Sequence, residues 1–297
     1  MCNFTKILFV QIAKWKLLYF FAKITVIQSD LVISCTASVR KSHTKISFPV
    51  LKRDILFLLG GEILRAIGSA YWDMGNRENN EDSLIYEQVM SGQTRLILAM
   101  VADGIGGLPE GEVASGFLTE KIVETFQKNL IPLLLKGNSV RKSIPIIRKA
   151  LYKTGEELTE YALVRKICLG STLSLLLVCR NQYLIVQLGD SAIYRCRGKN
   201  MKKLSISHNN KDGSINRCVG SVPYFEPFIK TGYVMKNTGF LVCSDGFYKK
   251  LDTKMCLFRP GDIEGEEDID RRLREGASFV KKKGEKDNIS AIYVKLY

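Results

Sequence analysis

Histidine is scarce in this chain of 297 residues, and its cysteines lack metal-binding spacings. Neither of its two histidines, His43 and His208, neighbours a serine or cysteine in a recognisable nucleophile motif. The eight cysteines form no CxxC pair, so no zinc site is expected. Several cysteines lie in apolar runs, where a free thiol behaves as a small hydrophobic side chain. We therefore expect reduced cysteines and a cytoplasmic location.

Uninterrupted apolar runs of membrane-spanning length are also missing. A spanning helix needs ~20 mostly apolar residues, but lysines interrupt residues 4–27, and Lys23, Gln28 and Asp30 interrupt residues 17–35. No apolar core with a small-residue cleavage site marks a signal peptide. We expect residues 1–68 to be a basic, apolar leader and residues 69–297 to be one folded domain. The leader could be an interfacial amphipathic anchor, a poorly ordered extension, or sequence upstream of the natural start.

The net charge of +14 is unevenly distributed. Residues 1–68 hold ten Lys and Arg against three Asp and Glu, so the leader is far denser in positive charge than the rest of the chain. A basic balance favours acidic or phosphorylated partners. No motif of aromatic and basic residues indicates nucleic acid, and we expect no nucleic-acid partner. Membrane contact would come only through the leader, and we expect a monomer.

Short acidic motifs are the most informative feature that is present. Each places an aspartate beside glycine, asparagine, serine or a second acid, and most lie at the end of a short apolar run. Carboxylates gathered from distant strand ends suit a hard divalent cation, which binds carboxylate, carbonyl and water oxygens. An adjacent glycine lets the backbone come close enough for a carbonyl to join them. The motifs occupy residues 77–82, 101–107, 188–191, 243–246 and 286–288.

Apolar periodicity predicts the order of secondary structure. We expect an irregular, lid-like stretch at 205–233. Strands in pairs, with two consecutive helices between them and one late helix, suit two packed sheets flanked by helices rather than a doubly wound parallel sheet. Strands are predicted at residues 69–73, 83–87, 95–102, 172–179, 183–188, 192–196, 239–244 and 289–296, and helices at 109–129, 140–164 and 264–283.

In their order along the chain and in their residue types, these motifs resemble those of the type 2C metal-dependent serine/threonine protein phosphatases in their compact bacterial form. The match runs from about Ser69 to Tyr297. The resemblance implies an α+β fold, an αββα sandwich of two mainly antiparallel sheets flanked by helices, with a metal site in the cleft between the sheets. The segments that carry it are residues 73–83, 101–115, 170–173, 188–195, 241–247 and 287–290.

The resemblance also implies two Mn²⁺ or Mg²⁺ ions that share a bridging water. Asp82 and Asp103 would bind metal, with Asp103 holding the bridging water, while Asp245 and Asp287 would hold the other ion. Asp190 would bind a third, weaker ion together with Asp245. The full implied ligand set is Glu81 (through a water), Asp82, Asp103, Gly104 (by its carbonyl), Asp190, Asp245 and Asp287.

Arg77 matches the family position that contacts the substrate phosphate, and its guanidinium fork suits a phosphate dianion. The alternative is a surface arginine paired with Glu78 or Glu81. Departures from the family pattern leave the general acid open. Ile105 stands where some members place a proton-donating histidine after Asp-Gly. His208 could help release the leaving alcohol, or it could be a loop histidine without a role.

The first hypothesis is therefore metal-dependent hydrolysis of phosphoserine and phosphothreonine in proteins, with a serine/threonine kinase as a possible partner. A pseudophosphatase that binds phosphoproteins without turnover is the main alternative, although aspartates stand at every implied metal position. A dinuclear phosphodiesterase or nuclease would need histidine ligands, which the domain lacks. A cysteine-dependent phosphatase is disfavoured because Cys243 is followed by Ser-Asp-Gly rather than by a phosphate loop.

Overall fold

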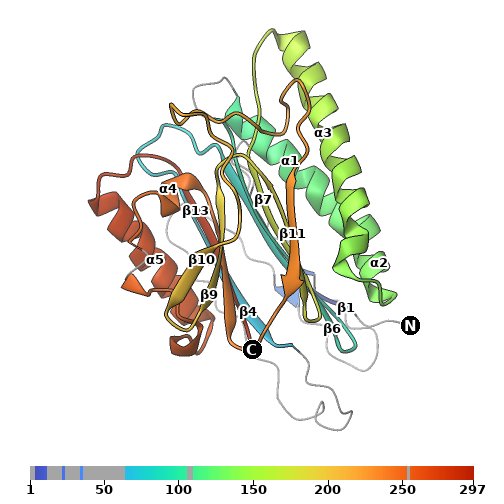
Figure 1. The fold of residues 1–297 in the computed structure, drawn as a ribbon, viewed down its shortest axis with the longest axis vertical. Coiled ribbons are helices and arrows are strands. Elements are labelled where there is room, and N and C mark those ends of the chain that lie inside the picture. The colour runs from blue at the N-terminus through green and yellow to red at the C-terminus, as the bar shows by residue number, and fades with distance from the viewer. Residues whose placement is uncertain (1–3, 12–21, 24–33, 36–63, 106–109, 253–254) are drawn as a thin grey trace.

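Two β-sheets pack face to face, with helices on both outer faces (Figure 1). The computed structural model describes residues 4–11, 22–23, 34–35, 64–105, 110–252 and 255–297. Helices α1 (Gly111–Thr125) and α3 (Ile144–Arg165) cover one sheet, and α5 (Glu266–Lys282) covers the other. The arrangement is an αββα sandwich, so the fold expected from the sequence is confirmed.

The first sheet contains six antiparallel strands in the order β1-β5-β6-β7-β8-β11. In the register of β5 with β6, Asp82 lies opposite Asp103, so the first two acidic motifs meet at one sheet end. The strands are β1 (Phe4–Gln11), β5 (Asp82–Ser91), β6 (Thr94–Asp103), β7 (Leu173–Cys179), β8 (Gln182–Leu188) and β11 (Phe228–Tyr233).

The second sheet contains five antiparallel strands in the order β10-β9-β12-β13-β4. Cys243 pairs with Ala291, which places the segment after β12 next to the segment before β13. The strands are β4 (Ala66–Asp73), β9 (Ala192–Arg197), β10 (Asn200–Lys203), β12 (Thr238–Cys243) and β13 (Ile289–Leu296). Apart from both sheets, β2 (Ala22–Lys23) pairs with β3 (Ser34–Cys35).

The remaining helical segments are short. A π-helical turn, η1 (Phe126–Leu130), follows α1 and continues into α2 (Ile131–Leu135). A 3₁₀ turn, η2 (Val140–Ser143), leads into α3, whose second residue is Pro145, a position where proline is tolerated. On the other side of the molecule lie α4 (Asp245–Tyr248) and η4 (Pro260–Asp262).

Strand β6 shows why the central strands read as continuous apolar runs. Side chains alternate between the two faces of a sheet. Leu98 and Met100 pack in the cluster beneath α1 and α3, whereas Ile97 and Val101 pack between the two sheets. A third cluster, around Tyr293, lies between the second sheet and α5. Both faces of β6 are therefore buried, and every position favours an apolar residue.

Strand β5 runs on to Ser91 rather than ending at Glu87, and β10 was not expected. Two further expectations about element bounds were wrong. The stretch 205–233, expected to be irregular, contains β11, which pairs with β8 along its whole length. Pro227 directly precedes it and Gly232 interrupts its sequence pattern, so the pairing comes from the neighbouring strand rather than from local propensity. Strand β4 begins at Ala66, not Ser69, and Arg65 exchanges two backbone hydrogen bonds with Tyr297, at 2.8 and 2.9 Å.

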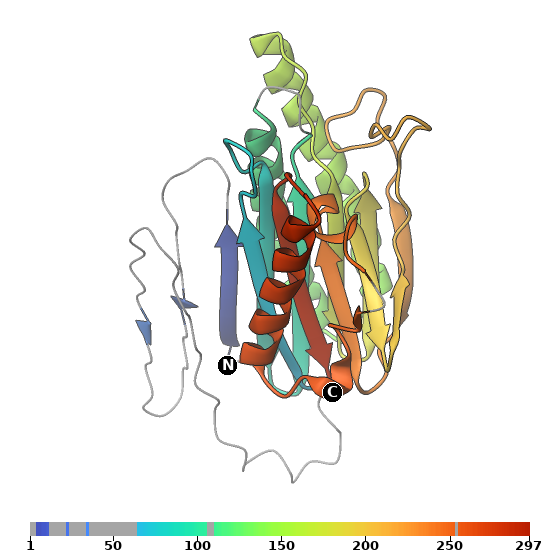
Figure 2. The ribbon, with the colours of Figure 1, turned by 90° about the vertical axis from the view of Figure 1, so that its left-hand side faces the viewer.

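The leader contributes a strand to the first sheet. Strand β1 pairs antiparallel with β5, from Phe4 opposite Ser91 to Gln11 opposite Leu84, and forms the edge of the sheet (Figure 2). The division of the chain at residue 68 stays a prediction, although β4 crosses it. Apart from β1, β2 and β3, the leader residues that the anchor and extension interpretations concern lie outside the described ones. Within the described part of the chain, no helix combines the length and apolarity needed to cross a membrane.

Candidate active site

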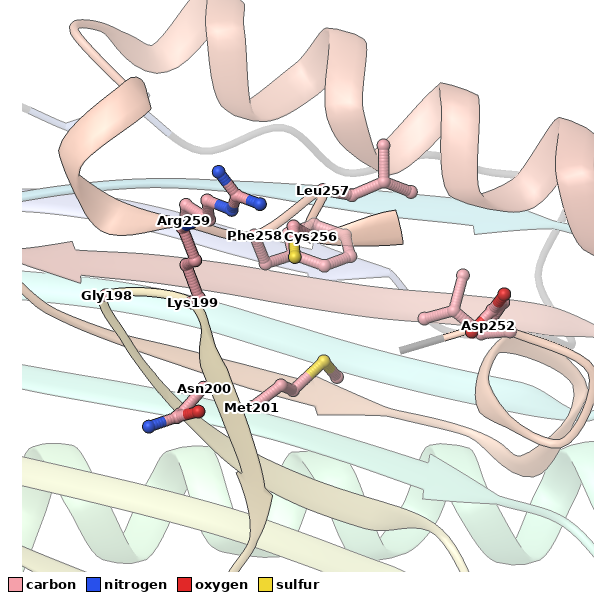
Figure 3. A pocket seen from close by; sticks show the side chains of 10 residues that line it. Gly198, Lys199, Asn200, Met201, Asp252, Cys256, Leu257, Phe258 and Arg259 are labelled. Atoms are coloured by element: carbon pink, nitrogen blue, oxygen red, sulfur yellow. The ribbon is translucent and has the colours of Figure 1, made fainter. Parts of the chain in front are cut away.

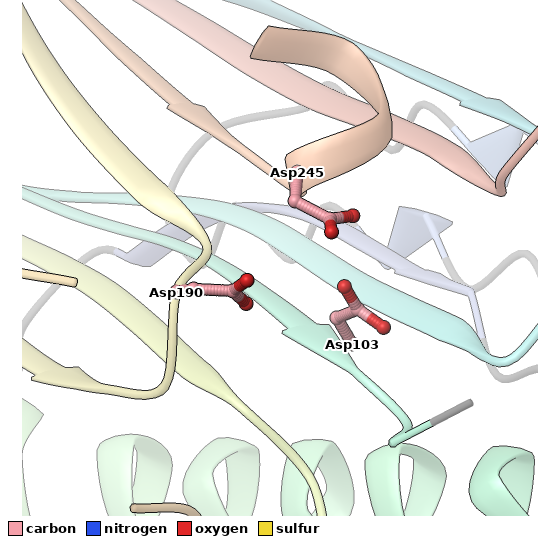
Figure 4. Close-up of side chains that lie close together, drawn as sticks. All are labelled: Asp103, Asp190 and Asp245. Carbon is pink, nitrogen blue, oxygen red and sulfur yellow. The ribbon is translucent and has the colours of Figure 1, made fainter. Parts of the chain in front are cut away.

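Three aspartates from separate segments meet at one end of the sheets (Figure 4). Asp103 ends β6, Asp190 lies in the turn between β8 and β9, and Asp245 begins α4 directly after β12. One carboxylate oxygen of each lies within 4.8 Å of the others. Among the described residues, this acidic cluster contains only carboxylates, the ligands that hard cations prefer.

Asp82 lies beside this acidic cluster, opposite Asp103 in the strand pairing, and is 1% exposed. Neither carboxylate oxygen accepts a hydrogen bond from any described group. Burial raises the pKa of Asp82 to about 7, and the charges of Asp245 and Asp287 add to the rise, while the nearby hydroxyls of Ser290 and Ser244 oppose it. A buried carboxylate without a partner is costly. The position therefore suits a cation.

The carboxylates of the acidic cluster also repel one another. Burial raises the pKa of Asp103 well above its usual range, and the charges of Asp82, Asp245 and Asp190 raise it further. Burial likewise raises the pKa of Asp245, although its hydrogen bond to Lys249 lowers it. Like charges gathered in a buried place destabilise their ionised forms. Divalent cations would reverse this balance by favouring the carboxylates.

The backbone around Asp103 is held from two sides. The Asp103 amide donates to Thr172 Oγ1 at 3.0 Å, and this hydroxyl shares a 2.7 Å hydrogen bond with Ser191. The Gly104 amide donates to the Glu81 carbonyl at 3.0 Å. A Cβ on Gly104 would lie 2.3 Å from the carbonyl oxygen of Gly111, so only glycine fits here. The start of α1 thereby packs directly against the motif.

Arg77 and Asp287 form the rim of the site. Arg77 Nη2 lies 3.1 Å from each oxygen of the Asp287 carboxylate, and the two side chains are 48% and 35% exposed. The arginine therefore pairs with Asp287, rather than with Glu78 or Glu81 as the alternative interpretation had it. The negative charge of Asp287 raises the pKa of Arg77. Burial raises the pKa of Glu81, and the charge of Glu112 adds to the rise.

Asn288 is a residue whose role the sequence did not reveal. Its buried side chain accepts a hydrogen bond from the Glu81 amide at 2.8 Å. Its amide nitrogen donates to the carbonyls of Met74, at 2.8 Å, and Asn79, at 3.0 Å. Asn288 thus ties the loop that carries Arg77 and Glu81 to the loop that carries Asp287. The only sequence signal was an asparagine that follows an aspartate just before a strand.

Lys249 was also missed. Its Nζ lies 2.5 Å from Asp245 Oδ2 and 3.7 Å from Asp190 Oδ2. Asp190 is held further by Asn209, whose Nδ2 donates to Asp190 Oδ2 at 3.2 Å, and by Tyr248, whose hydroxyl donates to the Asp190 carbonyl at 2.9 Å. The sequence signal was a lysine four residues after the Asp-Gly aspartate.

A polar cavity of about 410 Å³ adjoins the site. Asn209 lines it and also donates to Asp190, so this residue links the cavity lining to the acidic cluster. His208, Arg217, Glu226 and Phe228 line it as well. Burial and the charge of Arg217 lower the pKa of His208. Both effects disfavour the imidazolium form of the side chain.

Another cavity lies between the β9–β10 hairpin and residues 256–259 (Figure 3). It encloses about 10 Å³, which is room for roughly one water molecule. It is too small for a substrate group, and no carboxylate of the acidic cluster lines it. This cavity therefore offers no second place for the reaction.

Comparison with solved structures reveals the same fold in bacterial phosphatases. PppA, described as a key regulatory component of T6SS in Pseudomonas aeruginosa, superposes with a TM-score of 0.64 at 24% identity, over 78% of this chain and 98% of that chain. The Mycobacterium tuberculosis serine/threonine phosphatase PstP/Ppp gives a TM-score of 0.62 at 19% identity, over 77% and 98%. A structure of the PstP catalytic domain in complex with two manganese ions gives 0.61 at 20% identity, over 78% and 99%. No curated protein matches the chain in sequence.

The fold and the acidic cluster together define a metal-dependent phosphoric monoester hydrolase. The chain belongs to the protein phosphatase 2C family, whose sequence pattern matches residues 74–291. It is thus a metal-dependent serine/threonine protein phosphatase, and its substrates are phosphorylated proteins. This confirms the function expected from the sequence.

Proposed function

We propose that Asp82, Asp103, Asp245 and Asp287 hold two divalent cations, with Glu81 acting through a water and the Gly104 carbonyl completing the set. The observation that carries this assignment concerns Asp82. Its buried carboxylate lies opposite Asp103 and has no hydrogen-bond partner among the described residues. Oxygen ligands alone favour Mn²⁺ or Mg²⁺ over softer metals. The PstP catalytic domain, which shares the fold, is in complex with two manganese ions.

When bound, two such cations activate a shared water at neutral pH and neutralise charge on the phosphoryl oxygens. The residues of this chain supply the positioning. Asp103 orients the attacking water, because its backbone is fixed by Thr172 and by the strand pairing of β6. Arg77 lies at the exposed rim, where its guanidinium can turn from Asp287 to a phosphate dianion.

The cavity of about 410 Å³ beside Asn209 is the candidate binding place for the polypeptide that flanks the phosphorylated residue. Its lining combines the apolar Ile206, Pro227 and Phe228 with polar and charged side chains, which suits a peptide segment. His208 lies in this lining and is the available candidate for assisting the leaving alcohol. A serine/threonine kinase that phosphorylates the same proteins would be the functional partner.

The free cysteines support a proposal for the chain's cellular setting. All six cysteines in the described part of the domain are free, as suits a reducing compartment, and we place the protein in the cytoplasm as a monomer.

Two competing functions are disfavoured. A nuclease of the dinuclear class would need histidine ligands, and the described acidic cluster has none. A cysteine nucleophile is disfavoured at Cys243, because burial raises the pKa of its thiol.

The test is metal dependence in the full chain. We expect hydrolysis of p-nitrophenyl phosphate and of phosphothreonine peptides with Mn²⁺ or Mg²⁺, and its loss in EDTA. Asp103→Asn and Asp245→Asn should each lower kcat by at least about 10²-fold, because each removes a charge that holds the metals. Asp270→Asn, in an exposed ion pair on α5, is the control and should leave activity unchanged. Full activity in EDTA would refute the mechanism, and binding without turnover would favour the pseudophosphatase.

A further inference from the structure

Lys249 reaches into the acidic cluster from the end of α4. Its ammonium lies 2.5 Å from Asp245 Oδ2, one helical turn earlier in the chain, and 3.7 Å from Asp190 Oδ2, on a different loop. A single positive charge thus lies between two carboxylates that different segments contribute. These are the two aspartates that the family resemblance assigns to a third, weaker cation.

An exposed ion pair between neighbours on a helix would be a simpler interpretation, since the Lys249 side chain is 48% exposed. Such pairs contribute little to stability. The contact with Asp190 argues against a simple surface pair. The Asp190 side chain is 3% exposed, and its Oδ1 accepts no hydrogen bond from the described residues. A buried carboxylate requires a compensating charge. Within the described residues, Lys249 supplies it.

Hydrogen bonds from neighbouring residues also hold Asp190 in place beside Lys249. The adjacent residue, Tyr248, donates its hydroxyl to the Asp190 carbonyl at 2.9 Å, which locks α4 to the turn that carries Asp190. Asn209 holds the same carboxylate oxygen that faces the ammonium, at 3.2 Å. The Asp190 side chain is therefore turned towards Lys249 by contacts that do not involve Lys249 itself.

We propose that the Lys249 ammonium takes the place of a third cation, so that this chain binds two divalent ions rather than three. The inference rests on the proposed function, since it concerns the same site. An ammonium and a divalent ion held between the same two aspartates would repel each other. The lysine therefore supplies a fixed positive charge at the position where a loosely bound ion would otherwise come and go. Activity should then depend on the metal concentration only through the two tight ions.

The test counts bound metal in the full chain. Wild type, Lys249→Met and Lys249→Asp are equilibrated with saturating Mn²⁺, dialysed against the same solution, and measured by elemental mass spectrometry. Lys128→Met is the matched control, because Lys128 pairs with Glu124 in the same i,i+4 geometry at 2.6 Å, and neither residue belongs to the acidic cluster. We expect about two ions per chain in wild type and in Lys128→Met. Both Lys249 variants should bind about one more.

The outcomes of this measurement distinguish a failure of this inference from a failure of the proposed function. Three ions in wild type, or an unchanged count of two in Lys249→Met, would overturn the role of Lys249 and leave the phosphatase assignment intact. No bound Mn²⁺ in wild type would overturn both. Circular dichroism and thermal unfolding confirm that each variant is folded, and Lys249→Asp gives a second reading because it replaces the cation with a possible ligand. If neither variant gains an ion, the lysine is a surface ion pair only.

Discussion

The side-chain oxygen of Asn288 accepts a hydrogen bond from the Glu81 amide at 2.8 Å, across a separation of 207 residues. This bond joins the loop before β5 to the loop before β13. The same side chain donates to the carbonyls of Met74 and Asn79. Asn288 therefore positions two loops of the active site through hydrogen bonds to their backbone groups.

Asn288→Ala should weaken metal binding and lower stability. The substitution removes three hydrogen bonds between part-buried groups, each worth about 0.5–1.5 kcal/mol net. Loss of a residue that orients ligands typically weakens metal affinity 10–100-fold. Calorimetric titration with Mn²⁺ and urea unfolding measure the two effects. Asn138→Ala, which removes one part-buried hydrogen bond to the Leu133 carbonyl, is the control. An unchanged Mn²⁺ affinity in Asn288→Ala would show that the loops are positioned by other contacts.

The metal-free protein should lose stability as the pH rises from about 4 to about 7. The pKa of Asp82 is about 7 in the folded chain, against an ordinary value of 3.8 for an exposed aspartate, so within this window the folded state binds more protons than the unfolded state. The free energy of unfolding then falls with pH, by at most about 1.4 kcal/mol per pH unit for one group. Thermal unfolding in EDTA at several pH values measures the slope.

Metal should remove that dependence, because the ions bind the ionised carboxylates and stabilise the folded state most at higher pH. Asp82→Asn should flatten the slope in EDTA, whereas Asp270→Asn, an exposed α5 residue, should not. A melting temperature that rises with pH in EDTA would contradict the cost of burying Asp82 without a partner.

Arg77→Ala should raise KM for phosphopeptides more than it lowers kcat. The guanidinium contacts the phosphate already in the ground state, so its loss weakens binding of substrate and transition state together. Arg77→Lys should recover only part of the affinity, since lysine lacks the bidentate fork. Steady-state kinetics with a phosphothreonine peptide measure both constants. Arg274→Ala, from the exposed pair with Asp270 on α5, serves as the control. Equal constants in wild type and Arg77→Ala would assign Arg77 to its pair with Asp287 alone.

Gly75→Ala should destabilise the fold and displace Asp287. Gly75 has a φ of +62°, and a Cβ there would lie 2.0 Å from the Asp287 carbonyl oxygen. We expect a loss of more than about 1 kcal/mol, together with weaker Mn²⁺ binding. Gly198→Ala is the matched control, since Gly198 has a φ of +53° with open space around its Cβ position. Similar losses in both variants would mean that only the backbone conformation matters at Gly75.

Truncation should distinguish the leader from the domain. A chain that begins at Leu64 keeps β4, the paired Arg65 and the Leu64 carbonyl that accepts from Arg95 at 2.9 Å. It should retain activity close to that of the full chain, and a chain that begins at Ser69 should be less stable. Loss of β1 uncovers the edge of β5 and should increase self-association, which light scattering measures. Inactivity of the 64–297 chain would place leader residues in the site.

The sequence predicted most of the fold because its central strands are apolar on both faces and its acidic motifs fall where those strands end. Strand β13 was predicted with its exact bounds, since residues 289–296 form an unbroken buried run. Strand β11 was not, because its pairing partner β8, rather than its own composition, makes it a strand. Element bounds depend on neighbours that a linear pattern does not contain.

By itself, the sequence determined the residue types of the site, the order of its motifs and the family of the chain. Only the tertiary structure decided how these groups meet. The packing of two sheets brought Asp103, Asp190 and Asp245 within 4.8 Å of one another. It also turned Lys249 into that cluster and placed Asn288 between two loops. The physical reason is that carboxylate and ammonium contacts depend on distances of a few ångströms between segments far apart in the chain. Strand pairing and core packing fix those distances, and no local pattern encodes them.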